Sequence, residues 1–377
     1  MGKSLLRFSV LFLLLTATFW SAQAEQSVYA QVDAIATSET VSINDMASGW
    51  DGNYRSGELA FADASFVLGF SSDINTIERS LGTIRLEREL RAYYYMSFDK
   101  ETADFYRALE LGNDLTSDKK LDLKVKQFDA VGFSAGYTTP EFLIEDIKFQ
   151  LGFDLAVYQV NNFQFASVKG IAPNGDPESV SGIVDYRFDE DKLLDANGDP
   201  LQNYGSIKAG QGFSFSSYFK MTFEEVDFSL EIKDMFNVFE WDEGLHTTGC
   251  VNLSGGTGGA CEIECILRPG ERCILAAGGD TSLAKITEEI PATFRSKISH
   301  DSYDIDIHAM HHDKYYRLGL EKGFQTELGR FGLFLYHPRL VGASWQTDYF
   351  NFQFGADTLK LSEARNIQLN MGVNWHW

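Results

Sequence analysis

The chain ends in the stretch NIQLNMGVNWHW, residues 366–377, in which polar and apolar residues alternate. Successive side chains of a β-strand point to opposite sides, so the apolar members from Ile367 to Trp377 share one face of an extended strand. The other face carries amides, a glycine and a histidine, from Asn366 to His376. Lipid outside and a polar lumen inside impose this pattern on a membrane-crossing strand, with aromatic residues at the interface.

The same stretch resembles the C-terminal signal by which bacterial outer-membrane β-barrels are recognised by their assembly machinery. The matching positions are Asn370, Gly372, Trp375 and Trp377, the last residue of the chain. The resemblance implies a protein of the outer membrane of a Gram-negative bacterium. Its implied partners are outer-membrane lipid and the barrel assembly machinery.

The N-terminus has the features of a secretory signal peptide at residues 1–24. Lys3 and Arg7 accompany an apolar run that includes Leu11 to Leu15, and Ala22-Gln23-Ala24 supplies small residues for cleavage. Beyond residue 24 no run approaches the ~18–20 apolar residues of a membrane helix. Only helices and closed barrels satisfy their backbone groups in lipid, so an exported membrane protein of this kind is predicted to be a barrel.

Alternating strands recur through residues 56–377, for example over 147–157, 226–232 and 350–356. We predict an all-β fold, a transmembrane antiparallel up-and-down β-barrel of about fourteen strands, with twelve as the alternative. Residues 25–55 lack the alternation and are predicted to lie outside the barrel wall. They form either a periplasmic leader to the first strand or a small plug in the lumen.

Composition narrows the possible functions. The net charge of −22 disfavours nucleic acid as a partner, because phosphate binding requires a basic surface. The acidity fits either soluble acidic loops or attraction of cations. No segment places a nucleophile beside a base, and the glycines from Gly255 to Gly259 lack the Lys-Ser or Lys-Thr of a phosphate loop. The sequence therefore predicts neither an enzyme nor a cofactor.

Three short stretches, 210–215, 230–241 and 290–295, occur in an order that resembles the barrels of the long-chain fatty-acid transporter and conjugation-associated TraF-like group. They read GQGFSF, LEIKDMF followed by EW, and IPATFR. Transporters of hydrophobic compounds in this group carry an Asn-Pro-Ala-Gly type segment in an N-terminal hatch, and nothing between Glu25 and Phe70 matches it. The resemblance supports the fold and gives no support to a fatty-acid substrate.

A Gly-rich loop within residues 240–287 holds all four cysteines, Cys250, Cys261, Cys265 and Cys273. Exported proteins meet an oxidising compartment, so two disulfides are predicted, in any of three pairings. A four-thiolate zinc site is the alternative, but the spacing lacks paired Cys-x-x-Cys units. Long loops of such barrels usually face outward, although counting hairpins back from the C-terminus favours the periplasmic side.

A polar stretch at residues 195–199 partly resembles the start of a calcium loop. Its candidate ligands are Asp195, Asn197 and Asp199. Pro200 stands where the loop requires its glycine, and Ser206 stands where it requires a bidentate glutamate. The Asn-Gly and Asp-Pro pairs form turns without metal, so we predict turns here and no metal site.

Two sets of charged residues are predicted to face the lumen. One consists of Asp304, Asp306, His308 and His312, opposite Ile305, Ile307 and Ala309; the other consists of Arg85, Glu87, Glu89 and Arg91. The first set is suited to a divalent cation or to a proton-sensitive constriction, or is ordinary lumen polarity. The second set, with both signs interleaved, is expected to cross-link the wall or, alternatively, to act as a selectivity filter.

Two functions fit these patterns. The first is passage of a small or hydrophobic solute, of unknown identity, across the outer membrane. The second is a non-transporting barrel that anchors or supports a surface or envelope assembly through its cysteine loop. A transporter needs a continuous path or a mobile plug, whereas a scaffold can have a lumen packed with side chains.

Overall fold

The computed structural model describes residues 25–48, 50, 52–75, 79–175, 180–189, 208–252, 260–264, 272–276 and 278–377, without the side chains of 47–48 and 250–281. The predicted signal peptide, residues 1–24, and the calcium candidates Asp195, Asn197 and Asp199 lie outside the described residues. None of the described helices has the length and apolar run that a membrane-crossing helix needs.

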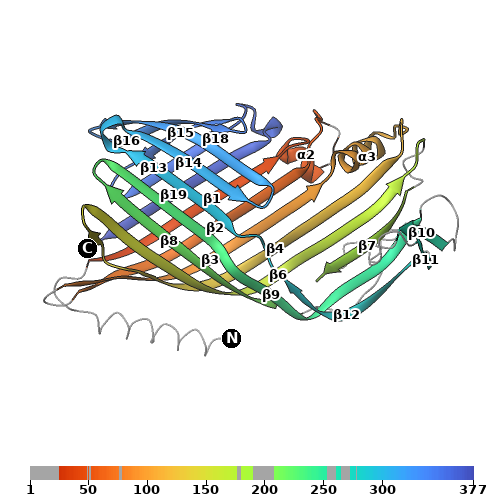
Figure 1. Ribbon diagram of the computed structural model, residues 1–377, viewed down its shortest axis with the longest axis horizontal. Coiled ribbons are helices and arrows are strands. Elements are labelled where there is room, and N and C mark those ends of the chain that lie inside the picture. The colour runs from red at the N-terminus through yellow and green to blue at the C-terminus, as the bar shows by residue number, and fades with distance from the viewer. Residues whose placement is uncertain are drawn as a thin grey trace.

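Fourteen antiparallel strands close into a barrel, as the alternating pattern predicts (Figure 1). The wall strands are β1 (Gln26–Ser38), β2 (Leu59–Asn75), β3 (Ser80–Phe98), β4 (Lys119–Thr138), β6 (Ile147–Ala172), β8 (Gly210–Phe223), β9 (Val226–Asn252), β13 (Thr293–His300), β14 (Ile305–His312), β15 (Tyr315–Thr326), β16 (Gly329–His337), β17 (Leu340–Gln346), β18 (Phe350–Ala356) and β19 (Asn366–His376). Shorter elements are β5 (Phe142–Ile144), β7 (Ser181–Phe188), β10 (Ala260–Glu264), β11 (Arg272–Ala276), β12 (Gly278–Glu288), α2 (Ile43–Ser48), α3 (Lys100–Leu111) and the 3₁₀ turns Asp301–Tyr303 and Leu361–Glu363.

The first and last strands close the barrel by pairing with each other, from Ser27 opposite His376 to Thr37 opposite Asn366. Backbone hydrogen bonds also join Gln26 and Trp377 in both directions, at 3.2 and 3.0 Å. Both described ends of the chain therefore lie at one end of the barrel, which we call the terminal end. Because wall strands alternate in direction, β9 and β14 begin at this end, and β13 finishes there.

The prediction that residues 25–55 lie outside the wall is wrong for residues 26–38. Residues 26–38 form β1, which pairs with both β2 and β19, so the barrel begins at Gln26 and not near Ser56. The sequence pattern does not reveal this strand because its outward face carries weakly apolar alanines, among them Ala30, Ala34 and Ala36. The more apolar Ile35 is buried on the luminal side. Neighbouring strands, and not a strong local pattern, hold it in the wall.

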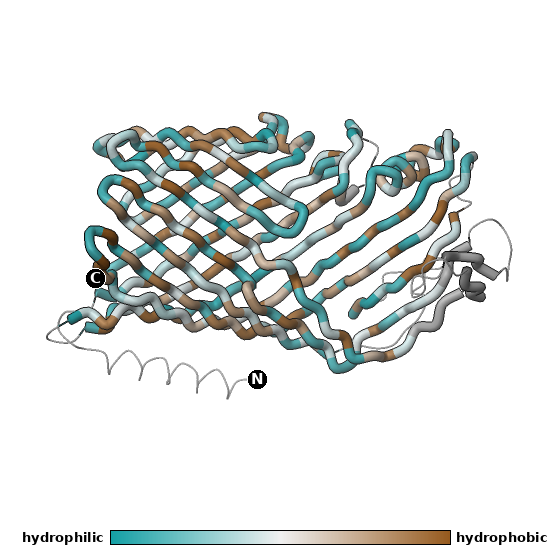
Figure 2. The backbone as a smooth tube through the Cα atoms, viewed as in Figure 1, coloured by the Kyte–Doolittle hydropathy of each residue, from teal (hydrophilic) through white to brown (hydrophobic). Residues whose placement is uncertain are grey.

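Hydrophilic and hydrophobic residues alternate along many of the wall strands (Figure 2), and the exposure of their side chains alternates as well. On β16, Leu333 and Leu335 are each 61% exposed, whereas Phe334 and Tyr336 are 2% and 3% exposed. Outward Val373, Trp375 and Trp377 of the terminal segment are also more than half exposed. The barrel thus presents an apolar outer surface and, unusually for a simple water-filled channel, also buries large aromatic residues inside.

The wall is much taller on one side than on the other. Strands β6 and β9 have 26 and 27 residues, whereas β17 and β18 have 7 each. A membrane needs only about 9–11 tilted residues per strand. The long strands extend away from the terminal end and carry β7, β12 and the hairpin β10–β11 at their far ends (Figure 1).

The cysteine loop belongs to this extension. The backbone places Cys250 at the end of β9, Cys261 on β10 and Cys273 on β11, all at the end opposite the termini. The cysteine side chains, and all of Cys265, lie outside the described residues. Both the predicted disulfides and the alternative zinc site therefore stay predictions.

Two helices pack beside the wall at the end opposite the termini. Val41, Trp50, Phe98 and Ala103 form a small buried cluster there, separate from the luminal core. Asp99 begins α3 by accepting a hydrogen bond from the Thr102 backbone N–H.

The Tyr54 hydroxyl donates to the Asp104 carboxylate of α3 at 2.6 Å. Burial and this carboxylate raise the pKa of Tyr54, which keeps the hydroxyl protonated as the donor of that bond.

Candidate functional site

The four charged residues of β3 that were predicted to face the lumen, Arg85, Glu87, Glu89 and Arg91, all project into it and all have partners. The Nη2 of Arg85 donates to both carboxylate oxygens of Asp154 on β6, at 2.9 and 3.0 Å. Glu87 accepts from Tyr29 and from Ser134. These contacts join strands on one side of the wall, which fits the cross-linking interpretation better than a ring of free charges.

The fourth residue, Arg91, is the centre of a buried ion network. Its guanidinium donates two hydrogen bonds to Asp63 of β2, at 3.0 and 2.9 Å, and two to Asp234 of β9, at 3.0 and 2.8 Å. All three side chains are no more than 3% exposed. One planar guanidinium therefore satisfies two carboxylates, a geometry that lysine could not provide.

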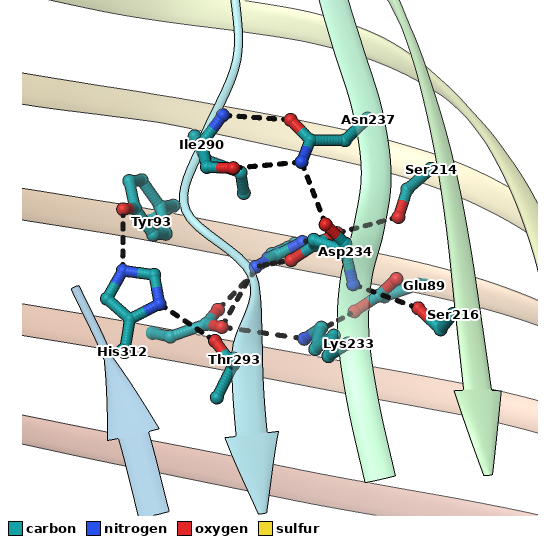
Figure 3. A network of polar contacts seen from close by, with 12 residues as sticks. Glu89, Tyr93, Ser214, Ser216, Lys233, Asp234, Asn237, Ile290, Thr293 and His312 are labelled. Carbon is teal, nitrogen blue, oxygen red and sulfur yellow. Dashed lines mark hydrogen bonds and ion pairs between the residues drawn. The ribbon is translucent and has the colours of Figure 1, made fainter. Parts of the chain in front are cut away.

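Two further charges complete this network, which we call the central network: Asp63, Glu89, Arg91, Lys233 and Asp234. The Lys233 ammonium lies 3.5 Å from Asp63 and 3.6 Å from Glu89. The Tyr158 hydroxyl donates to Glu89 at 2.6 Å, and Ser214 donates to Asp234 at 2.7 Å. Figure 3 shows Lys233 reaching Glu89, and Asp234 meeting Ser214 and Ser216.

An irregularity in β9 brings both Lys233 and Asp234 inside. Consecutive residues of a regular strand point to opposite faces, but Asp234 has φ 57° and the pairing of β8 with β9 shifts at this level. The Ser216 side chain accepts from the Asp234 backbone N–H at 3.1 Å. Asn237 exchanges hydrogen bonds with the Ile290 backbone, at 2.9 and 2.8 Å, and also donates to the Asp234 carbonyl (Figure 3).

The central network crosses the lumen. Asp234 lies four strands away from Arg91 around the wall, through β4, β6 and β8. Beside it, Arg295 of β13 donates to Asp33 of β1 at 2.6 Å. Strands β1 and β13 are seven steps apart in either direction around the fourteen, so this ion pair joins opposite walls. The described side chains thus close the lumen at this level.

His312 joins the same closure from β14. The Tyr93 hydroxyl lies 2.9 Å from its Nε2 and the Thr293 hydroxyl 2.8 Å from its Nδ1, as Figure 3 shows. The imidazole is fully buried and stacks on Phe61, with ring centroids 4.4 Å apart. Both ring nitrogens have partners and the site lies within packed rings, so His312 holds two walls together and is not placed as a metal ligand.

An aromatic layer lies on the side of the central network away from the terminal end. Phe128, Phe163, Phe239 and Trp241 are each at most 1% exposed. Ring centroids are 4.7 Å apart for Phe128 and Phe239, and 4.2 Å apart for Phe163 and Trp241. Polar and apolar layers therefore close the lumen in succession.

The other predicted luminal residues form a second cluster near the terminal end. Asp304 precedes β14 in a left-handed turn, with φ 50°, and accepts from Arg330 at 2.8 Å. Arg330 also pairs with Asp306 at 3.0 Å and with Glu321 at 3.2 Å. His308 lies beside Glu321, at 3.5 Å.

The ligand atoms of Asp306, His308 and Glu321 lie within 4.8 Å of one another, the spacing a metal ion requires. Arg330 and Lys297 already neutralise these carboxylates, with Lys297 at 2.9 Å from Asp306. A divalent cation would have to displace two fixed positive charges. The arrangement therefore favours a cross-linked wall over a metal centre.

Sequence reasoning found Arg91 and Glu89 of the central network but missed Asp63, Lys233 and Asp234. Asp63 lies in an Ala-rich segment without strong alternation, and Lys233 and Asp234 are adjacent, so only one was expected to face inward. The break in the alternation of the β9 sequence, with two charges side by side, was a signal of an irregular strand. No sequence signal links Asp33 to Arg295.

No family model and no curated protein matches this sequence. Solved structures with a similar fold include a mutant of the TodX monoaromatic hydrocarbon channel, with 10% identity, a TM-score of 0.39 and coverage of 96% of this chain and 92% of that one. The P. putida toluene transporter TodX gives 9%, 0.39, 96% and 91%. The siderophore receptor PirA from Pseudomonas aeruginosa gives 7%, 0.20, 94% and 81%. These likenesses concern the barrel class alone.

Proposed function

We propose that this chain is an outer-membrane β-barrel that passes a small solute, and that the structure is its closed state. The outer-membrane location is supported by the closed antiparallel wall, its apolar outer surface and the terminal aromatic strand. The wall has no free edge through which to bind a partner strand in the membrane. The distinctive feature of this barrel is the set of charged residues in its lumen.

The central network is the observation that carries the proposal. Buried ion pairs add little net stability, and well-packed apolar residues often replace them without loss. A barrel selected only as a solid scaffold has no need of five buried charges across its lumen. Polar groups that can be rehydrated one after another can form a gate, and ionisable residues at membrane depth commonly mark solute paths.

The test is single-channel conductance of refolded protein in planar bilayers. Wild type is expected to be almost silent. The double variant Arg91→Ala/Asp234→Ala should raise the conductance above that of wild type, because it removes the contact between β3 and β9. The matched control is Arg85→Ala/Asp154→Ala, which removes a luminal ion pair on one side of the wall only and should stay silent.

The aromatic layer is a second barrier, so a further variant adds Phe128→Ala and Phe239→Ala to the double variant. Heat-modifiable mobility on gels verifies that each barrel has folded. If all variants fold and none conducts, solute passage is refuted and the scaffold function gains. The scaffold is favoured by one specific observation, the direct Arg295–Asp33 contact between opposite walls.

A further inference from the structure

A cavity of about 250 Å³ lies in the lumen beside the central network. It is on the terminal side of that network. On β9, Ser229 and Glu231 precede Lys233, and on β13, Lys297 follows Thr293 toward the terminal end. A space of this size can hold several waters or one small organic molecule.

The cavity is more basic than the protein around it. Arg295, Lys297 and Arg317 line it, against the carboxylates Asp33 and Glu231. Asp306, outside the lining, pairs with Lys297, so three cations and three carboxylates balance here, whereas the whole chain carries a net charge of −22. A site with balanced charges repels a small anion less than the rest of an acidic protein does.

Arg317 differs from the other two cations in its partners. Arg295 pairs with Asp33 and Lys297 pairs with Asp306. Within the described part of the chain, no carboxylate lies at ion-pair distance from Arg317. Its Nη1 donates to the Gln368 side-chain oxygen at 2.7 Å.

The flat guanidinium of Arg317 lies 4.5 Å from the Tyr336 ring centroid and near the Tyr315 hydroxyl. A guanidinium has five N–H donors, so several stay available toward the cavity.

We infer that this cavity binds a small carboxylate anion through Arg317. A planar guanidinium held against an aromatic ring presents its donor edge for bidentate pairing with a carboxylate. The side-chain amides of Gln353 and Asn370 also line the cavity and offer further hydrogen-bonding groups. The inference names the solute class for the passage proposed above and rests on that proposal only for its physiological role.

The test is isothermal titration calorimetry of the refolded full-length barrel in detergent, with succinate as the probe. Saturable binding is expected for wild type. Arg317→Gln should weaken it at least about tenfold, equivalent to about 1.4 kcal/mol. The matched control, Arg88→Gln, changes an arginine of β3 that lies over Phe133 and does not line this cavity, and it should bind succinate as wild type does.

Two further probes make the result independent of any variant that folds poorly. Succinamide has the same shape without charge and should not bind wild type; equal binding of both compounds would refute the inference. Inorganic phosphate that bound more tightly than succinate would also refute a carboxylate site. Because binding is measured without flux, succinate binding by a silent barrel would refute only the proposed passage, and conductance without succinate binding would refute only this inference.

Discussion

Single residues in this lumen differ in what they contribute, and burial decides the difference. Arg91 and Arg85 lie on the same strand and each donates hydrogen bonds to carboxylates. The Arg91 side chain is 1% exposed and serves two carboxylates, whereas the Arg85 side chain is 26% exposed and serves one. Water screens the second pair and cannot screen the first.

The pair of arginines therefore gives a matched prediction. Arg91→Gln leaves Asp63 and Asp234 buried without their guanidinium, and it should lower the unfolding free energy by about 3–5 kcal/mol. Arg85→Gln should lower it by no more than about 1 kcal/mol. Urea unfolding of the refolded protein, followed by tryptophan fluorescence, measures both. Equal losses in the two variants would contradict the assignment of Arg91 as the centre of the network.

Strand patterns explain which residues sequence could assign and which it could not. Alternation locates Arg85, Glu87, Glu89 and Arg91 on one face of their strand, because the period of two is a local property. It cannot show that Asp234 lies beside Arg91, since that contact depends on barrel closure and on an irregular residue in β9. A local sequence pattern predicts which face of a strand a residue occupies. A contact across the lumen can be predicted only when the register of every strand between the two residues is known.

At the level of elements, the pairing of β1 with β19 gives the sharpest contrast with the expectation from sequence. If residues 26–38 formed a plug, deleting them would open the lumen and leave an intact barrel with a higher conductance. Because they form the closing strand, the deletion should instead abolish heat-modifiable mobility and leave degraded protein. Gel mobility and membrane fractionation distinguish the two outcomes, and a folded, conducting product would contradict the observed strand pairing.

The end of β19 and the final residue should matter for assembly as well. Deleting residues 375–377 removes the backbone bonds between Gln26 and Trp377 and two exposed tryptophans, Trp375 and Trp377. We expect a severe fall in outer-membrane levels. Replacing His376 alone with Gln, on the luminal face, serves as the control and should leave the level unchanged. Normal insertion of the truncated chain would count against the assembly role of this segment.

The cysteine-bearing hairpin supplies a chemical prediction. Two disulfides in the stretch 247–279 would make the peptide lighter by four hydrogens in mass spectrometry without reductant, and alkylation should label none of the cysteines. Four alkylated thiols, or zinc bound at one ion per chain, would favour the alternative. The outcome also decides whether covalent bonds stiffen the tall side of the wall.

For the whole molecule, the unequal height of the wall predicts how the proposed outer-membrane barrel would sit in the bilayer. Strands β17 and β18, with 7 residues each, are shorter than the about 9–11 residues of a typical membrane-crossing strand, so we expect the bilayer to surround the terminal half of the barrel, where all fourteen strands are present. The outer halves of β6 and β9, with α3, β7 and β10–β11, then project into water on the other side (Figure 1). The acidic composition and the polar end of the tall wall fit that exposure.

This placement predicts which turns a probe can reach. A short epitope inserted at Asn113–Asp114, after α3, should be bound by antibody on intact cells, because that loop is exposed at the end opposite the termini. The same epitope at Glu224–Glu225, in the tight turn between β8 and β9 at the terminal end, should be bound only after the outer membrane is permeabilised. Both insertions use the same barrel and the same antibody, so each is the control for expression and for antibody binding of the other. The reverse pattern would invert the barrel, place the cysteine hairpin in the periplasm, and put the Arg317 cavity on the side from which solutes enter the cell envelope.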